Sequence, residues 1–157
     1  NKNLLFTEGC IEAFNNEKLQ LWSNGLRYGK SMINDFNNGT VGWTDWNILL
    51  DEKGGPNHVS NFCFAPIHSD TKTGSLIYTP SYYFIGHFSK FIEPGARRIS
   101  SVSSRSNLLT TSFLNPNGQI TTIVLNNSSK KVIYNLCIEK QTTEIEILPF
   151  SIQTLIH

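Results

Sequence analysis

Hydrophobic positions in the first third of the chain switch from a strand-like to a helix-like pattern and back. Leu4-Leu5-Phe6 is an unbroken apolar run, which predicts a strand buried on both faces. From Leu19 to Phe36 the apolar residues recur at steps of three and four, as they do on one face of a helix. A second strand is expected from Val41 to Asn47. The pattern therefore predicts a strand–helix–strand unit.

The ends of these two strands should meet. A crossover connection returns the chain in the same direction, so the strands are parallel neighbours. Glu8 ends the first strand and Asp45-Trp46-Asn47 ends the second, so these side chains should emerge at the same end of the sheet. Parallel sheets and barrels carry their chemistry at that end. A carboxylate beside a tryptophan face suits a sugar site, although Trp43 is better explained as a core residue.

Turn residues and a second helix follow. A hairpin is expected from strands at 61–67 and 75–78 around the turn Asp70–Gly74, inserted at about 48–79. Thr79-Pro80 then favours a helix start. The buried face of this helix would consist of Phe84, Ile85, Phe88, Phe91 and Ile92.

From Arg97 to His157 the pattern is wholly β. Asn115-Pro116-Asn117-Gly118 predicts a hairpin turn between 108–114 and 119–126, and alternating apolar residues continue to the end of the chain. Short strands at regular spacing predict an antiparallel β-sandwich. The expected division is an α/β domain over 1–95 and an all-β domain over 96–157.

Composition and charge exclude several classes of function. The formal net charge is +1 and no basic run is present, which excludes a nucleic-acid partner. Apolar runs are shorter than the ~20 residues of a bilayer span. Cys10, Cys63 and Cys137 are too widely spaced for a zinc site or a disulfide framework, so buried free thiols are expected and no metal site.

The chain begins at Asn1 and its one methionine is Met32. A single parallel strand pair does not make a stable sheet. We therefore expect residues preceding Asn1 to belong to the complete fold.

Several motifs carry a family resemblance. They are Leu5-Phe6-Thr7-Glu8-Gly9-Cys10, Gly25-Leu26-Arg27-Tyr28, Val41-Gly42-Trp43-Thr44-Asp45-Trp46-Asn47, Gly54-Gly55-Pro56-Asn57 and Gly86-His87-Phe88-Ser89-Lys90-Phe91-Ile92. Together they resemble, in this order and over essentially the whole chain, the C-terminal part of the glucosylceramidases of glycoside hydrolase family 30.

The resemblance implies an architecture and a site. The fold would be the last two β/α units of a TIM (β/α)8 barrel with an inserted β-hairpin, followed by an antiparallel β-sandwich. The activity would be hydrolysis of β-glucosidic bonds with retention of configuration. Glu8 matches the nucleophile at the end of the seventh barrel strand. Trp46 and Asn61 match residues that line the glucose pocket, and Asp45 matches a position with an orienting or structural role.

The resemblance also sets expectations beyond these residues. The acid/base glutamate would lie upstream of Asn1, since Glu12, Glu17 and Glu52 are not well placed for the role, so the chain alone should lack activity. No cofactor is expected. The substrate would be a glycoside or a glycosphingolipid, with membrane contact only through a lipid substrate, in a secreted or lysosomal-type compartment. Gly9 is often alanine in the family, and His58 stands where tryptophan is frequent.

Two other interpretations stay open. The chain could be a non-catalytic carbohydrate- or protein-binding β-sandwich module carrying a barrel remnant. Phe113, Tyr134 and Phe150 argue against this, because they are scattered as core residues are and form no aromatic strip. Alternatively, another chain could supply the rest of the barrel in trans.

Overall fold

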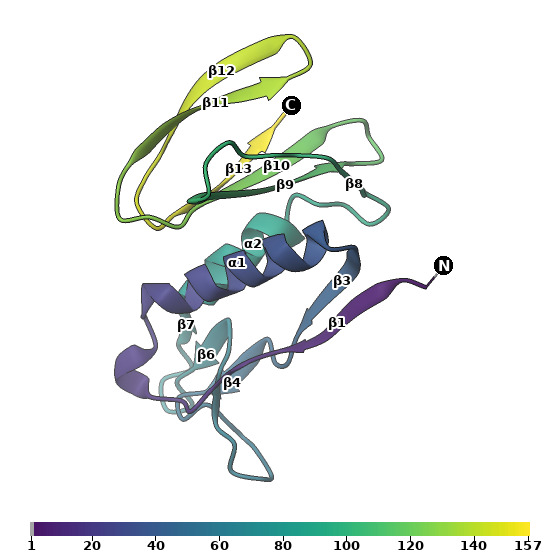
Figure 1. The fold of residues 1–157 in the computed structure, drawn as a ribbon. Coiled ribbons are helices and arrows are strands. Elements are labelled where there is room, and N and C mark those ends of the chain that lie inside the picture. Colours follow the sequence, from purple (N-terminus) through teal and green to yellow (C-terminus); the bar gives the residue numbers. More distant parts are fainter. Residues whose placement is uncertain (1) are drawn as a thin grey trace. The chain divides into compact units, whose positions relative to one another are not determined.

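A computed structural model describes residues 2–157, and the chain divides into two compact units, Asn1–Gly86 and His87–His157 (Figure 1). The first contains β1 (Leu4–Gly9), β2 (Ile11–Glu12), a 3₁₀ turn (Asn16–Lys18), α1 (Trp22–Asn37), β3 (Thr40–Asp45), β4 (Leu49–Asp51), β5 (Cys63–Phe64), β6 (Ile67–Ser69) and β7 (Leu76–Tyr78). Helix α2 (Pro80–Ser89) crosses the boundary between the units.

The predicted strand–helix–strand unit is confirmed. Strands β1 and β3 pair in parallel, with Leu5 opposite Gly42, Phe6 opposite Trp43 and Gly9 opposite Asp45. Helix α1 begins at Trp22 rather than near Glu17, because Asn15 caps the separate 3₁₀ turn that precedes it. Tyr28, Met32 and Ile33 form its buried face.

The expectation that β1 is buried on both faces is wrong for this chain. Leu4 is 57% exposed and Leu5 is 59% exposed. Within the part of the chain that the structure describes, β1 and β3 form a two-stranded sheet, and α1 packs against β3. Leu4 and Leu5 are consecutive and point to opposite faces of the strand, so β1 has an exposed apolar side chain on each face.

The insertion is more elaborate than one hairpin. The β6–β7 hairpin forms as expected around the turn at Asp70, with Ile67 opposite Tyr78. The expected continuous strand over 61–67 is wrong, because Pro66 lacks the N–H that a ladder needs and separates β5 from β6. Strand β5 pairs with β2 instead, and β4 adds in parallel to β6.

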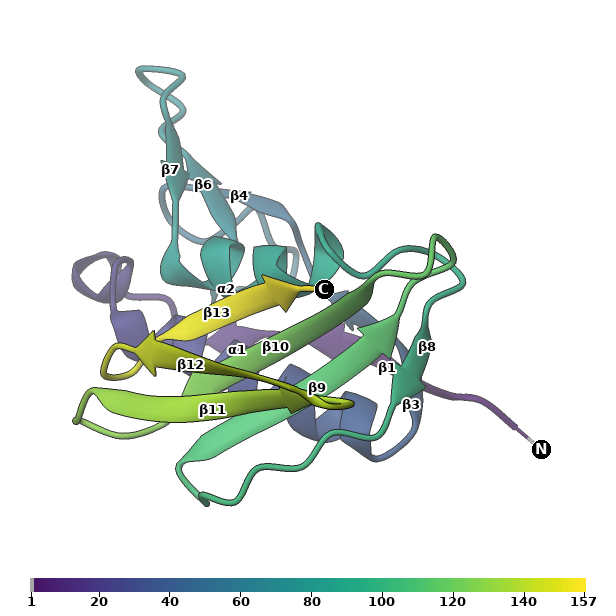
Figure 2. The same ribbon diagram turned by 90° about the horizontal axis from the view of Figure 1, so that it is seen from above.

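The second unit carries the predicted antiparallel strands. They are β8 (Arg97–Ile99), β9 (Leu108–Leu114), β10 (Ile120–Asn126), β11 (Val132–Ile138), β12 (Gln141–Ile147) and β13 (Ile152–Ile156). One sheet has the order β13-β10-β9-β8, and β11 and β12 form a separate hairpin that faces it (Figure 2). The hairpin turn between β9 and β10 lies where the sequence placed it.

The hydrophobic core of the second unit contains Leu108, Val124, Val132 and Ile147, which pack between the sheet and the hairpin. Cys137 on β11 is exposed, so the expectation of buried thiols is wrong at this position. The residue follows the strand alternation, which turns it outward while Leu136 and Ile138 are half-buried.

Candidate active site

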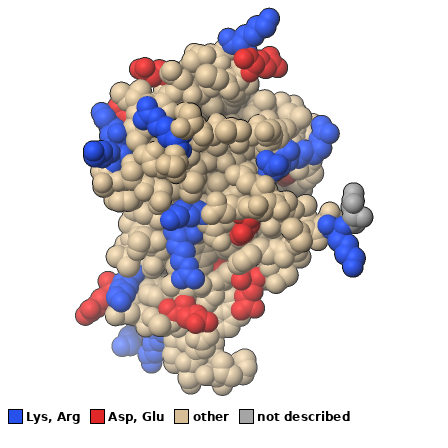
Figure 3. All heavy atoms as spheres, in the orientation of Figure 1, with Lys and Arg blue, Asp and Glu red and all other residues tan. Residues whose placement is uncertain are grey.

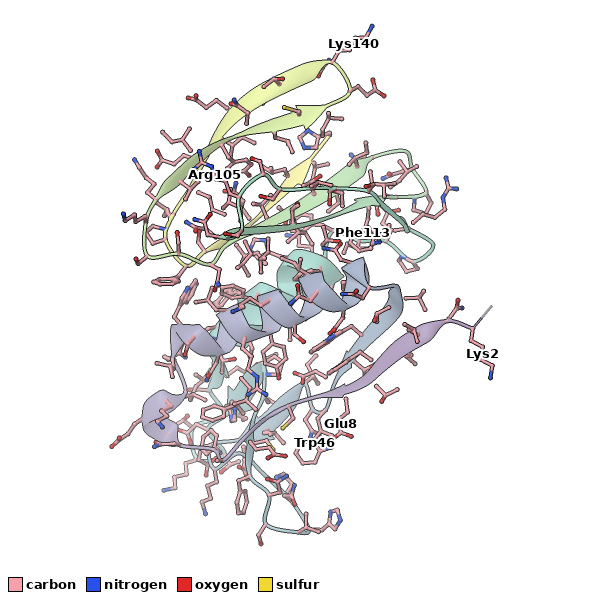
Figure 4. The ribbon with its side chains drawn as sticks, viewed as in Figure 1. Lys2, Glu8, Trp46, Arg105, Phe113 and Lys140 are labelled. Atoms are coloured by element: carbon pink, nitrogen blue, oxygen red, sulfur yellow. The ribbon has the colours of Figure 1, made fainter. Side chains whose placement is uncertain are left out.

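The ends of β1 and β3 meet directly. The backbone N–H of Trp46 donates to the carbonyl oxygen of Gly9 at 2.8 Å, one residue beyond the register pair of Gly9 and Asp45. The Glu8 and Trp46 side chains lie beside each other below this strand end (Figure 4). Glu8 is exposed, and Trp46 is 37% exposed. A carboxylate and an indole face are therefore available to a molecule approaching this edge.

Asp45 is anchored through one of its two oxygens. Oδ1 accepts hydrogen bonds from the Tyr28 hydroxyl at 2.9 Å and from the Trp46 backbone N–H at 3.0 Å. Oδ2 is buried and has no hydrogen-bond partner among residues 2–157. Burial raises the pKa of the Asp45 carboxyl to about 6, although the two hydrogen bonds act to lower it. Burial, followed by the Asp45 charge, also raises the pKa of Tyr28.

Trp43 belongs to the packing layer and not to the candidate site. Its ring stacks on Phe6 with centroids 4.8 Å apart and meets Tyr28 edge-on at 5.6 Å. Its indole N–H donates to the carboxylate of Asp35 at 2.9 Å. A Cβ added at Gly9 would lie 2.5 Å from the Trp43 ring, so the glycine lets β1 approach this side chain.

Asn61 lies in an exposed loop before β5. The side chain of Asn57 shapes this loop by donating to the Asn61 carbonyl at 2.9 Å and accepting from the Val59 backbone N–H at 2.8 Å. No hydrogen bond joins the Asn61 side chain to Glu8 or Trp46 within the described residues. The structure thus brings Glu8, Asp45 and Trp46 to one strand end, whereas Asn61 lies in the loop before β5, the strand that pairs with β2.

Sequence reasoning missed three residues around the strand end. These are Arg27, Tyr28 and Ser31 of α1, which line a cavity of about 170 Å³ together with Glu8, Gly9, Cys10 and Trp43. The helical spacing of Tyr28 and Ser31, three residues apart and facing β1, was the available signal. Arg27 breaks the apolar stripe and offered no such signal.

Residues 2–157 contain no group of three or more His, Cys, Asp or Glu that could hold a metal ion. Lysine and arginine are interspersed with acidic residues on the face shown in Figure 3. Neither helix in the described part of the chain is long and apolar enough to cross a membrane.

Known relatives share this chain's sequence over most of its length. Lysosomal acid glucosylceramidase of Mus musculus is 39% identical over 136 residues, which cover 84% of this chain and 26% of that protein. Putative glucosylceramidase 4 of Caenorhabditis elegans is 34% identical and matches 87% of this chain and 30% of its own length. The chain therefore spans less than a third of these relatives.

A solved structure shares the fold. SrfJ from Salmonella typhimurium superposes with a TM-score of 0.94 at 34% identity, covering 99% of this chain and 35% of that one. The similarity includes the strand–helix–strand unit, the insertion and the β-sandwich, since nearly all of the chain is matched.

Two family profiles account for almost every residue. The glycosyl hydrolase family 30 TIM-barrel domain matches residues 1–92, and the family 30 β-sandwich domain matches residues 95–155. The two matches follow the order expected from the motifs. The strand end that bears Glu8 and Trp46 is thus the rim of a partial barrel, and the chain belongs to glycoside hydrolase family 30.

Proposed function

We propose that this chain is the C-terminal portion of a retaining β-glycosidase that hydrolyses β-glucosidic bonds, with Glu8 as nucleophile. The observation that carries the proposal is the joined strand end: the Trp46 backbone N–H donates to the Gly9 carbonyl oxygen, and the Glu8 and Trp46 side chains lie at this same end (Figure 4). The glucosylceramidase names of the relatives support a glucoside or glucosylceramide-like substrate. The partial barrel and the β-sandwich would correspond to residues 1–95 and 96–157.

Retaining hydrolysis assigns two tasks to two carboxyl groups held roughly 5–5.5 Å apart. In the first step the Glu8 carboxylate attacks the anomeric carbon while an acid protonates the departing oxygen, and a covalent glycosyl–enzyme forms. In the second step the same partner, now a base, removes a proton from water, which attacks the anomeric carbon and releases Glu8. The partner glutamate would come from a strand that this chain does not contain.

The neighbours of Glu8 would position the sugar. Trp46 presents its half-open indole as a stacking face, and Asn61 would donate to a hydroxyl from the loop before β5. Asp45 is better suited to positioning than to contact. Its Oδ1 fixes the backbone N–H of Trp46 at 3.0 Å and so sets the direction in which the indole leaves the strand.

The proposed activity determines which other molecules the protein would need. The residues need no organic cofactor for this chemistry, because acid, base and nucleophile are all carboxyl groups. A glycosphingolipid substrate would bring the enzyme to a membrane surface through the substrate itself. A secreted or lysosomal-type compartment fits such a substrate.

The test is trapping of the covalent intermediate in the natural full-length protein. A 2-deoxy-2-fluoro-β-glucoside with a dinitrophenyl leaving group should add one glycosyl mass to the peptide that carries Glu8. Glu8→Gln should abolish labelling and lower kcat for an aryl β-glucoside by ~10³-fold or more, with unchanged thermal unfolding.

Glu12→Gln is the matched control, because Glu12 lies on the adjacent strand β2 and is also exposed. This variant should be labelled and should turn over substrate like the unaltered protein. Label on any other carboxylate, or a Glu8→Gln variant with full rate, would falsify the assignment of the nucleophile.

A further inference from the structure

Tyr28 joins helix α1 to the strand end of the candidate site. Its side chain is 4% exposed, and its ring meets Trp43 of β3 edge-on, with centroids 5.6 Å apart. Trp43 in turn stacks on Phe6 of β1. Beyond the ring, the Tyr28 hydroxyl donates to Asp45 Oδ1 at 2.9 Å. One buried side chain thus contacts the packing layer with its ring and the strand end with its hydroxyl.

The hydroxyl of Tyr28 is not needed to fill space. A phenylalanine would supply the same ring, and taking a hydroxyl out of water costs free energy unless the group is hydrogen-bonded. Burial, followed by the Asp45 charge, raises the pKa of Tyr28, so the hydroxyl keeps its proton and remains a donor. The position therefore combines a core ring with a donor to one carboxylate.

Among residues 2–157, the Tyr28 hydroxyl is the one side chain that hydrogen-bonds the Asp45 carboxylate. The other donor to Oδ1 is the backbone N–H of Trp46, the next residue in the chain, at 3.0 Å. A carboxylate that is held only by its neighbour's N–H does not tie that N–H to any other element. The Tyr28 hydroxyl links both groups to helix α1.

The shared N–H belongs to the residue whose indole faces the site. It lies between two acceptors, Asp45 Oδ1 and the Gly9 carbonyl oxygen, the latter at 2.8 Å. Trp46 is 37% exposed, so packing fixes its ring less firmly than the ring of a core residue. The direction of the indole therefore depends on these backbone anchors.

Helix α1 makes a second polar contact with β3, which serves as a comparison. Asp35 lies seven residues after Tyr28, on the same face of the helix, and accepts from the Trp43 indole N–H at 2.9 Å. This contact ends within the packing layer, whereas the Tyr28 contact ends on the carboxylate that holds the strand end. Of the two contacts, the one made by Tyr28 is next to the site.

We propose that Tyr28 is a positioning residue of the sugar site: its hydroxyl holds the Asp45 carboxylate, which holds the Trp46 backbone N–H and so the direction of the stacking face. This inference rests on the proposed function, in which Trp46 stacks on the sugar. Stacking acts on the bound substrate and on the transition state alike, so loss of alignment should raise KM and leave kcat nearly unchanged. A merely structural role would lower the fraction of active enzyme, and thus kcat, at constant KM.

The test is Tyr28→Phe in the natural full-length protein, which removes the hydroxyl and keeps the ring. KM for an aryl β-glucoside should rise by about 3- to 10-fold, the effect of one lost hydrogen bond, with kcat within about twofold. In a Trp46→Ala background the same change should alter KM by less than about twofold, because the two residues act through one contact chain. Tyr134→Phe is the matched control, since Tyr134 lies in the second unit and also loses a hydrogen bond, from Gln153 at 2.6 Å. Its KM should equal that of the unaltered protein.

A second measurement does not depend on activity. Hydrogen–deuterium exchange of the Trp46 backbone amide, read by mass spectrometry, should be at least about fivefold faster in Tyr28→Phe than in the unaltered protein or in Tyr134→Phe. Faster exchange in a protein that hydrolyses no β-glucoside would reject the proposed function and retain the anchoring by Tyr28. A folded Tyr28→Phe variant with unchanged KM or unchanged Trp46 exchange, or an additional rise in KM in the Trp46→Ala background, overturns the proposal.

Discussion

Asp45 combines a carboxylate oxygen held by two donors with one that is buried and has no donor within the described residues. Burial raises its pKa from 3.8 to about 6, so the folded state favours the protonated carboxyl. The stabilisation of the folded state by the protonated Asp45 carboxyl is fully present below pH 3.8. It is lost as pH rises through about 6, because the unfolded chain releases this proton more easily.

Asp45→Asn should remove this pH dependence. The amide does not ionise, so the difference in melting temperature between the variant and the unaltered protein should grow in favour of the variant as pH rises from 3.8 to about 6. Thermal unfolding followed by circular dichroism over this window measures the effect. Parallel melting curves for the two proteins across the window would contradict the assignment.

His68 makes the stability of the folded protein depend on pH in the opposite direction. The ring is 0% exposed; Nε2 accepts from the Ala65 backbone N–H at 2.9 Å and Nδ1 contacts the Asp51 carbonyl oxygen at 2.7 Å. This arrangement requires a neutral ring that donates at Nδ1. Burial lowers the pKa of His68, so its contribution to stability is present above pH 6.5 and is lost as pH falls below that value.

His68→Gln should cost about 1–3 kcal/mol of unfolding free energy near neutral pH, because the two backbone groups lose well-aligned partners. It should also flatten the decline in stability below pH 6.5. Urea unfolding at a series of pH values measures both effects. His58→Gln, at an exposed loop position, serves as the control and should retain the decline.

At the scale of elements, the contact between α1 and α2 depends on one glycine. Trp22 of α1 meets Phe84 of α2 edge-on, with ring centroids 5.2 Å apart. A Cβ at Gly25 would lie 2.3 Å from the Phe84 ring and 3.0 Å from the Pro80 carbonyl oxygen. Because Phe84 is 0% exposed, the ring has no free space into which to move.

Gly25→Ala should therefore destabilise the protein by about 1–3 kcal/mol, since overpacking outweighs the gain in helix propensity. Gly86→Ala in α2 is the matched control. A Cβ there meets nothing within 4 Å, so the same substitution should stabilise by about 0.5–1 kcal/mol. Denaturant midpoints of the two variants should move in opposite directions. If both move the same way, the close approach of Gly25 to Phe84 does not govern stability.

The same elements show which features the sequence could predict. Periodicity from Leu19 to Phe36 identified α1, and Asn115–Gly118 identified the β9–β10 turn, because both signals are local. Strands β2 and β5 have two residues each, too few for any period, so their pairing could not be predicted. The packing of Cys10 with Cys63 and the Tyr28–Asp45 hydrogen bond join residues far apart in the sequence, so no local pattern predicted them.

At the scale of the whole molecule, the chain covers 26% of the mouse relative and 35% of SrfJ. The first unit contains three glutamates besides Glu8. Glu12 is on β2, Glu17 is in the 3₁₀ turn, and Glu52 is committed to Thr71 through two hydrogen bonds. Under the proposed function, Glu8 would supply one of the two carboxyl groups that retaining hydrolysis requires.

The isolated chain should accordingly show no turnover of an activated aryl β-glucoside above the buffer rate. Addition of the rest of the barrel, in cis as the natural full-length protein or in trans as a second polypeptide, should restore hydrolysis. Release of nitrophenol over time measures both cases. Robust turnover by the chain alone would mean that the acid/base lies within residues 1–157.

Strand β1 pairs on one side only within the described residues, and this strand carries Glu8. Backbone hydrogen bonding on the other side would fix its height and tilt, because an edge strand accepts whatever register its next neighbour imposes. With Glu8 as the proposed nucleophile, the reach of its carboxylate toward an anomeric carbon would then depend on that neighbour. Enzymes built this way can lose rate through substitutions in a distant strand that never contacts the sugar.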